Sequence, residues 1–388
     1  MRLSKLAIIA GEPSGDMLAA ELVAALTERL GARPELVGVG GEALQRQGLT
    51  SLFDQSELSI IGFSAVIARL PKLIWRIRQT AAAVIAARPD CLIIVDSPDF
   101  THRVARRVRR ALPDLKIINY VCPTVWAWKP ERAPAMTAYV DHVLSVLPFE
   151  PEIVAELGGP PLTYVGHRLM FDPGLLAARA AQARRAERPA DPERAPVCLI
   201  LPGSRGSEIA RLIGPFGAAA AHLARLDPAM RFVLPASPRV EARVRAAVGG
   251  WSVPCEVVSG EDAKWQAFGE ADVAIAASGT VLLELAIVGV PHMSSYKLDF
   301  IARRLVHKLT TWSMALPNLI AGHVVVEEQY NNHVLPERLA RTAANLARDT
   351  PRRAAMLAEF AVIRERMHTD APPSATAADV VLAVLART

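Results

Sequence analysis

The sequence has few of the residues that mark secreted, metal-binding or membrane-spanning proteins. Its 388 residues include four cysteines, and no two of them stand at the C-x-x-C spacing of a zinc or redox site. We therefore expect reduced thiols and no metal centre. No apolar run approaches the roughly 18 to 20 residues of a membrane-spanning helix, and acidic residues follow the first apolar run too soon for a signal peptide. The sequence therefore predicts a cytoplasmic protein.

Aromatic residues are also scarce, at 5%, and charged residues make up 21% of the chain. The apolar share of 51% still allows a sizeable core, and the length suggests two domains. The formal net charge of +5 would suit an anionic membrane surface, a phosphorylated substrate or nucleic acid, although a GC-rich genome that encodes arginine often would also produce it. Because the basic residues are dispersed and form no stripe, we do not expect nucleic acid to bind.

Short apolar runs alternate with helical patterns along both halves of the chain. This alternation predicts parallel βαβ units, and therefore two Rossmann-like, doubly wound parallel sheets in an α/β fold. We expect the domains in this order: an N-terminal domain at 1–172, a linker at 173–194, a C-terminal domain at 195–345 and a helical tail at 346–388. The tail would pack back on an N-terminal domain, either its own or that of a second copy.

The motif GEPSGD follows the first expected strand, and doubly wound sheets bind their ligands at the carboxyl ends of strands. It lacks the GK[ST] sequence of a phosphate-binding P-loop, so we do not expect hydrolysis of a nucleoside triphosphate. Glu12 would repel phosphate but suits a hydroxyl-rich ligand, and Ser14 or Asp16 could cap the helix that follows. An ordinary turn between a strand and a helix is the alternative.

Two carboxylates follow the third expected strand, in the motif DSPDF. Pro98 disfavours helical geometry at Ser97, so the chain should turn sharply there. Asp99 would then precede the next helix as an acidic cap. Asp96 would face the crevice, where it could act as a general base. Position alone leaves open whether Asp96 is catalytic or only part of a turn.

Two motifs in the second half place small and polar residues between a strand and a helix. LPGSRGSEI carries Ser204 and Arg205, whose guanidinium fork suits a diphosphate. ASGT carries residues 278–280, and the helix that begins there could hold phosphates without a metal. Glu284, one turn further along, would lie near a ribose. A solvated arginine, a capping serine and a surface glutamate are the alternatives.

Eight motifs occur along the chain in a fixed order: AGEPSGD, DSPDF, TVWAWK, LPFE, YVGH, LPGSRGSEI, ASGT with Glu284, and LPNLIAG. In this order, over residues 6–331, the sequence resembles the lipid-A-disaccharide synthases. The resemblance implies an inverting GT-B glycosyltransferase, with two domains facing a cleft and no metal or other cofactor. It would transfer 2,3-diacylglucosamine from UDP-2,3-diacylglucosamine to the 6-hydroxyl of 2,3-diacylglucosamine 1-phosphate (lipid X). The products would be the β-1,6-linked disaccharide 1-phosphate and UDP.

The resemblance also implies roles for individual residues. Asp96 would be the general base, because the family's pattern places this role on the first acid of DSPD. The residues implied on the donor side are Ser204, Arg205, Ser278, Gly279, Thr280, Glu284 and Asn318, and those on the sugar and acceptor side are Glu12, Ser14, Asp16 and Trp126. Trp126 could stack on a sugar, cover an acyl chain or belong to the core. The segment 326–331 departs from the family's pattern and places Glu328 and Asn331 at its acid and its amide.

Both implied substrates are acylated, so the protein would act at the cytoplasmic face of a Gram-negative inner membrane as a peripheral protein. The segment 59–79 interleaves apolar and basic residues, which is typical of an interfacial helix. We expect Phe63, Ile67, Trp75 and Arg76 to contact the membrane. A core helix of the first domain is the alternative, and both hold if only one face packs.

Two other functions compete with the implied one. Another UDP-sugar protein of GT-B type, such as an epimerase or a different glycolipid transferase, should lack TVWAW and LPNLIAG. A nucleotide-sugar-binding scaffold that has lost activity is kept open by the altered residues 327–331. The sequence leaves the acyl-chain preference and the oligomeric state open, a homodimer included.

Overall fold

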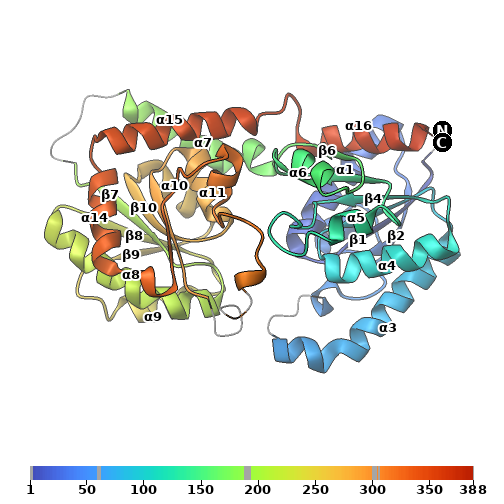
Figure 1. The fold of residues 1–388 in the computed structure, drawn as a ribbon, viewed down its shortest axis with the longest axis horizontal. Helices are drawn as coiled ribbons and strands as arrows, with labels where there is room; N and C mark the ends of the chain where they lie inside the picture. The colour runs from blue at the N-terminus through green and yellow to red at the C-terminus, as the bar shows by residue number, and fades with distance from the viewer. Residues whose placement is uncertain (1–2, 59–62, 188–193, 299–303, 305, 388) are drawn as a thin grey trace. The chain divides into compact units, whose positions relative to one another are not determined.

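The computed structural model describes residues 3–58, 63–187, 194–298, 304 and 306–387. The chain forms two compact units, which Figure 1 shows as two separate sheets with their helices. Unit 1 comprises Met1–His167 and Thr369–Thr388, and unit 2 comprises Arg168–His368.

Unit 1 is built on a six-stranded parallel sheet with the strand order β2-β1-β3-β4-β5-β6. Its strands are β1 (Lys5–Ala10), β2 (Glu35–Val39), β3 (Cys91–Val95), β4 (Lys116–Tyr120), β5 (His142–Ser145) and β6 (Leu162–Tyr164). Its helices are α1 (Pro13–Leu30), α2 (Glu42–Arg46), α3 (Phe63–Ala87), α4 (Pro98–Ala111), α5 (Arg132–Met136), α6 (Glu150–Glu156) and α16 (Pro373–Ala386).

Alternate strand residues of unit 1 pack into two separate cores. Along β1, Leu6, Ile8 and Ala10 join one core with apolar residues of α1 and α16. Ala7 and Ile9 join the other core with apolar residues of α3 and α4. Because both faces are covered, β1 and β3 are apolar along almost their whole length, as is typical of parallel sheets.

Unit 2 repeats this architecture with the strand order β12-β11-β10-β7-β8-β9. Its strands are β7 (Val197–Leu201), β8 (Arg231–Ala236), β9 (Glu256–Ser259), β10 (Val273–Ala277), β11 (His292–Tyr296) and β12 (Glu328–Tyr330). Its helices are α7 (Pro173–Ala186), α8 (Gly206–Leu226), α9 (Glu241–Val248), α10 (Glu261–Glu270), α11 (Thr280–Val288), α13 (Leu316–Ala321), α14 (Pro336–Leu346) and α15 (Pro351–Arg366). The expected α/β fold with two Rossmann-like parallel sheets is confirmed.

The strand order of each sheet reverses at one point. In unit 1 the chain leaves β1 for β2 on one side and continues from β3 on the other. In unit 2 the corresponding neighbours are β7 and β10. Doubly wound sheets bind ligands at the carboxyl ends of strands at such switch points. The motifs GEPSGD and DSPDF follow β1 and β3, and the motifs with Arg205 and Ser278 follow β7 and β10.

Residues 173–186 of the expected linker form α7, and the two main helices of the expected tail, α15 and α16, belong to different units. Helix α7 packs on α10 and α11 within unit 2, and α15 packs on α11 and α13 in the same unit. Helix α16 packs on α1 of unit 1 (Figure 1). Arg29 of α1 forms an ion pair with Asp379 of α16.

Candidate active site

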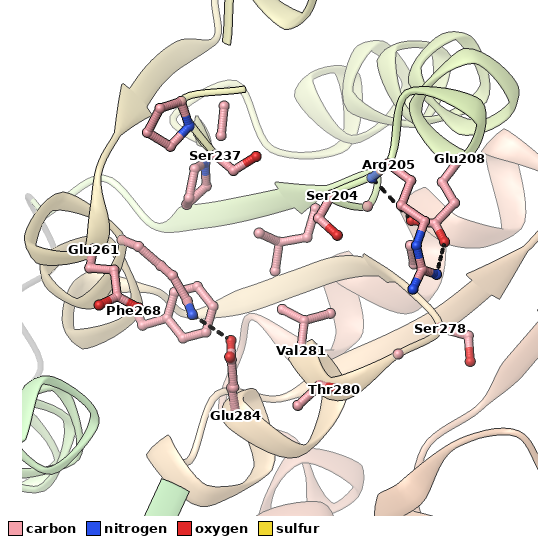
Figure 2. A pocket seen from close by; sticks show the side chains of 18 of the residues that line it. Ser204, Arg205, Glu208, Ser237, Glu261, Phe268, Ser278, Thr280, Val281 and Glu284 are labelled. Carbon is pink, nitrogen blue, oxygen red and sulfur yellow. Dashed lines mark hydrogen bonds and ion pairs between the residues drawn. The ribbon is translucent and has the colours of Figure 1, made fainter. Parts of the chain in front are cut away.

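Unit 2 contains a cavity of 520 Å³ at its switch point (Figure 2). The lining comes from the ends of β7, β8 and β10 and from the first turns of α8, α10 and α11. Its labelled side chains in Figure 2 include Ser204, Arg205, Glu208, Ser278, Thr280 and Glu284. The cavity therefore lies where the strand order predicts a ligand site.

Three helices begin at this cavity, with Arg205, Gly260 and Gly279 as their N-caps. The first amides of a helix have no partner within the helix and carry partial positive charge. Gly260 has φ 95° and Gly279 has φ 153°, values that favour glycine. Because glycine has no side chain to cap the helix, these amides remain available to an anion.

Arg205 pairs with the acid one turn further along α8. Its Nη1 lies 3.0 Å from Oε1 of Glu208, and its backbone amide lies 3.4 Å from Oε2 of the same carboxylate. The arginine side chain is 67% exposed, whereas that of Glu208 is 9% exposed. A side chain at Gly203 would begin 2.6 Å from the carboxylate, so this turn requires glycine. The guanidinium thus lies at the surface of the cavity, where it is free to turn toward a ligand.

Lys264 and Glu284 form a second ion pair in the cavity. Their Nζ and Oε2 atoms lie 2.8 Å apart, and both side chains are largely buried. Lys264 also lies 3.9 Å above the Trp265 ring. The sequence analysis did not predict Lys264, although it lies one turn into α10, the helix that follows β9. The order of strand, glycine and helix, shared with the other two motifs, was the available signal.

The cavity brings together six of the seven residues expected on the donor side: Ser204, Arg205, Ser278, Gly279, Thr280 and Glu284. Ser278 donates through Oγ to the carbonyl of Met314 at 3.2 Å, which connects the cavity to the segment before α13.

Asn318 is the exception, because it is fully buried and lies outside the described lining of the cavity. Its Oδ1 accepts from the amides of Val325 and Val326, at 2.8 and 2.7 Å. Its Nδ2 donates to the Val326 carbonyl at 3.0 Å. Asn318 therefore organises a loop, and the expectation that it faces the donor is corrected.

The altered segment contributes to the same loop. Glu328 accepts from Ser313 Oγ at 2.7 Å and from the Met314 amide at 3.0 Å. Asn331 accepts from the amide of Leu298 at 3.0 Å. These two side chains therefore hold neighbouring segments of unit 2 in place.

Asp96 lies directly after β3 in unit 1, at the switch point of the first sheet. Asp96 and Ser97 have φ of 53° and 45°, a left-handed conformation that is uncommon for residues other than glycine. The Ser97 amide donates to Asp96 Oδ1 at 2.7 Å, and Thr101 Oγ1 donates to the Asp96 carbonyl at 2.7 Å. These bonds fix the orientation of a half-buried carboxylate at the carboxyl end of the sheet.

The first glycine of GEPSGD, Gly11, makes room for this turn. A side chain at Gly11 would begin 2.3 Å from Ser97 Oγ, and one at Gly15 would begin 3.4 Å from Asp96 Cβ. The motifs that follow β1 and β3 therefore meet at the switch point, which gives Gly11 a steric reason, whereas a Cβ at Gly15 would make an ordinary contact.

Asp16 has a structural role and is 4% exposed. Its carboxylate accepts from the amides of Gly41, Ala43 and Leu44, at 2.7, 2.9 and 3.3 Å. It therefore caps α2, and the expectation that it presents its carboxylate to a sugar is corrected. Glu12 and Ser14 are exposed at the start of α1, which begins at Pro13, earlier than expected.

The prediction that Asp99 caps α4 is wrong. Helix α4 begins at Pro98 with Ser97 as its N-cap, because proline is favoured at the first helical position. Asp99 lies inside the first turn, and its carboxylate accepts from Nη2 of Arg132 at 2.9 Å.

Trp126 is half-buried and bonded to a buried acid. Its Nε1 lies 3.1 Å from Oε1 of Glu150, and its ring meets Phe149 edge to face at 5.3 Å. Glu150 is 1% exposed, and burial raises its pKa to about 8. The carboxyl group is therefore mainly protonated at neutral pH. The sequence analysis named its motif, LPFE, but assigned this glutamate no role.

The expected membrane segment lies on α3. The side chains of Phe63 and Ile67 lie outside the described residues. Further along the helix, Leu70, Ile74 and Trp75 are exposed at 42%, 40% and 53%. Ile77, Ala81 and Val84 are buried in the core, so α3 combines a core face with exposed apolar residues.

Arg76 follows Trp75 on α3, but its side chain packs on Glu57 and Phe53 of unit 1. Its guanidinium forms an ion pair with Glu57 at 2.7 Å and lies 4.4 Å above the Phe53 ring. Its side chain is only 13% exposed. The expectation that Arg76 contacts the membrane is therefore corrected, because its charge is already paired within unit 1. In the described part of the chain, no helix is both long enough and apolar enough to span a bilayer.

Sequence comparisons with known proteins agree on one family. A sequence model of the family Lipid-A-disaccharide synthetase matches residues 6–371. The lipid-A-disaccharide synthase of Rhodopseudomonas palustris is 47% identical over 390 residues, covering 99% of this chain and 97% of the relative. That of Bradyrhizobium diazoefficiens is 45% identical over 386 residues, covering 98% of this chain and 96% of the relative.

Solved structures share the fold at low sequence identity. The glycotransferase of kitacinnamycin superposes with a TM-score of 0.63 at 16% identity, and the match covers 99% of this chain and 100% of that chain. MurG of Acinetobacter baumannii superposes with a TM-score of 0.58 at 13% identity, covering 97% and 99%. These similarities concern the fold alone, and the expected GT-B fold is confirmed. Since the family model and the two lipid-A-disaccharide synthases match nearly the whole chain, the protein belongs to the lipid-A-disaccharide synthetase family.

Proposed function

We propose that this glycosyltransferase transfers 2,3-diacylglucosamine from UDP-2,3-diacylglucosamine to the 6-hydroxyl of 2,3-diacylglucosamine 1-phosphate, and releases UDP. The observation that supports it most is the cavity of unit 2, where six residues expected on the donor side lie together in a member of this family. Three helix N-termini and an exposed arginine are the groups that a nucleoside diphosphate needs.

Asp96 is the general base of this proposal. The carboxylate takes the proton of the acceptor 6-hydroxyl while that oxygen attacks C1 of the donor sugar. The bond between C1 and the UDP oxygen breaks on the opposite face, and its electron pair leaves with UDP, so the anomeric centre inverts. The proposal requires that Asp96 reach the acceptor hydroxyl while unit 2 holds the donor. The fixed, half-buried carboxylate at the switch point supports this assignment.

Arg205 and the starts of α8 and α11 would bind the diphosphate. Negative charge grows on the leaving UDP as the bond breaks, and preorganised donors stabilise such charge without reorganising. To bind a phosphate, the Arg205 guanidinium has to turn away from Glu208 or bind Glu208 and the phosphate at the same time. Its 67% exposure leaves it free to do so.

Glu284 would accept hydrogen bonds from the ribose hydroxyls of UDP. Lys264 neutralises this carboxylate at 2.8 Å, so that the anionic donor meets no unpaired acid there. On the acceptor side, the exposed Glu12 and Ser14 would bind sugar hydroxyls, and Trp126 would offer part of its ring.

Exposed apolar residues on α3 would bring the protein to its acylated substrates. Leu70, Ile74 and Trp75 would enter the interface of the inner membrane from its cytoplasmic face, together with Phe63 and Ile67.

The test is to incubate the protein with UDP-2,3-diacylglucosamine and 2,3-diacylglucosamine 1-phosphate, and to detect the disaccharide 1-phosphate by mass. Asp96→Asn should lower kcat by about 10²- to 10⁴-fold, the usual contribution of a general base. Asp114→Asn is the matched control, because it removes an exposed carboxylate of unit 1 that lies outside the described lining of both cavities. No product from the wild type would refute the reaction, and equal rates for wild type and Asp96→Asn would refute the base.

A further inference from the structure

Unit 1 contains a second cavity, of 330 Å³, that the proposed reaction does not yet use. It lies between the first two turns of α4, the segment that follows β4, and α5 with the residues after it. The polar side chains of its lining are Asp99, His102, Arg103, Arg106, Arg132 and Tyr139. Three guanidinium groups therefore meet in one cavity.

Two of these three arginines have no carboxylate partner in the described lining. Arg132 is paired with Asp99 at 2.9 Å, which is the one carboxylate of the lining. Arg106 lies 4.7 Å above the Tyr139 ring and 3.4 Å from its hydroxyl, neither of which carries charge. Arg103 has no hydrogen-bond or ion-pair partner in the part of the chain that the structure describes. The cavity therefore carries excess positive charge.

His102 adds no charge to this excess at neutral pH. It is buried, and its Nδ1 lies 2.9 Å from the hydroxyl of Tyr139. Burial is the main cause that lowers its pKa to about 4, and repulsion by Arg106 and Arg132 lowers it further. The histidine is thus a neutral wall of the cavity, and the arginines alone would bind an anion.

We propose that this cavity binds the phosphate monoester of the acceptor sugar, an inference that rests on the proposed function. Pro98 and Asp99 of the lining are the second and third residues after Asp96 on the chain. Cavity and base therefore lie at the same edge of the sheet of unit 1. The reacting hydroxyl and the phosphate are separated by one sugar ring, so base and anion site must be close neighbours. Arginine forks match the oxygens of a phosphate in pairs.

The test compares two double variants of α4. Arg103→Gln with Arg106→Gln removes two charges from the cavity. Arg107→Gln with Arg110→Gln removes two exposed charges from the same helix outside the described lining, and is the matched control. Activity is measured in detergent micelles with UDP-2,3-diacylglucosamine and either the acceptor 1-phosphate or its dephosphorylated form.

The cavity variant should raise KM for the phosphorylated acceptor by about tenfold or more, since each charge-assisted bond is strong. Its KM for the donor and for the dephosphorylated acceptor should equal those of the wild type, and the control should resemble the wild type throughout. An unchanged KM for the phosphorylated acceptor would overturn the inference, as would an equal rise for both acceptors. Arg103→Gln alone, which breaks no described contact, keeps the test valid if the double variant unfolds.

An anionic phospholipid headgroup offers the same chemistry as the acceptor, and a vesicle experiment separates the two. If the cavity variant loses binding to phosphatidylglycerol vesicles while its KM for the acceptor stays unchanged, the headgroup is the ligand and the inference is overturned.

Binding of glucosamine 1-phosphate, followed by ligand-observed NMR, gives a readout without turnover. If the wild type makes no disaccharide, the proposed function fails. In that case binding of this probe to the wild type and the control, and not to the cavity variant, still supports a sugar-phosphate site.

Discussion

Glu150 should make the stability of unit 1 depend on pH. The pKa of its carboxyl is raised by burial from 4.5 to about 8, so between these values the folded state holds a proton that the unfolded state has released. The free energy of unfolding must then fall as the pH rises through this interval. Each pH unit well inside the interval contributes about 1.4 kcal/mol. From pH 5 to pH 8 the wild type should therefore lose about 3 to 4 kcal/mol through this one group.

Glu150→Gln removes the titration and keeps an oxygen for the Nε1 of Trp126. Urea unfolding followed by circular dichroism at pH 5, 6, 7 and 8 should show the variant gaining on the wild type at each step. Glu152→Gln changes an exposed carboxylate on the same helix, and its difference from the wild type should stay constant with pH. A constant difference for Glu150→Gln as well would refute the reasoning, since it would mean that the buried group does not titrate in this range.

Two further predictions concern the donor cavity and the membrane. Lys264→Met should weaken UDP binding by about tenfold or more, measured by calorimetry, because the Glu284 carboxylate would then lie unpaired beside an anion. Lys308→Met removes an exposed lysine and is the control, which should bind UDP as the wild type does. An unchanged Kd would contradict the role of that ion pair. Replacing Phe63, Ile67 and Trp75 by serine should reduce co-sedimentation with phospholipid vesicles several-fold, and unchanged binding by a folded variant would remove α3 as the contact.

The positions of the donor residues could be predicted because they depend on strand ends. Two parallel sheets followed from the alternation of apolar runs, and the carboxyl ends of neighbouring strands meet at one edge. Ser204 and Arg205 after β7, and Ser278 to Thr280 after β10, therefore lie together in the structure. The same rule would have found Lys264 if it had been applied to the helix that follows β9.

The wrong or incomplete expectations concern polar side chains whose partners are distant in sequence. Asp16 caps a helix 25 to 28 residues further along the chain, and Arg76 pairs with Glu57 in a different element. Asn318 bonds a loop that no strand or helix pattern predicts. Local sequence cannot distinguish such structural partners from ligands, because a polar residue near a strand end suits both.

Helix α16 gives unit 1 a particular order of assembly during synthesis. Its residues Ala377, Ala378 and Val381 complete the core that contains the apolar face of α1. The roughly 200 residues of unit 2 are synthesised between the two parts of unit 1. At about 5 to 20 residues per second, this interval lasts about 10 to 40 s. During that time the face of α1 that α16 later covers stays exposed. The first half of the nascent chain is therefore the species that would bind chaperones or aggregate.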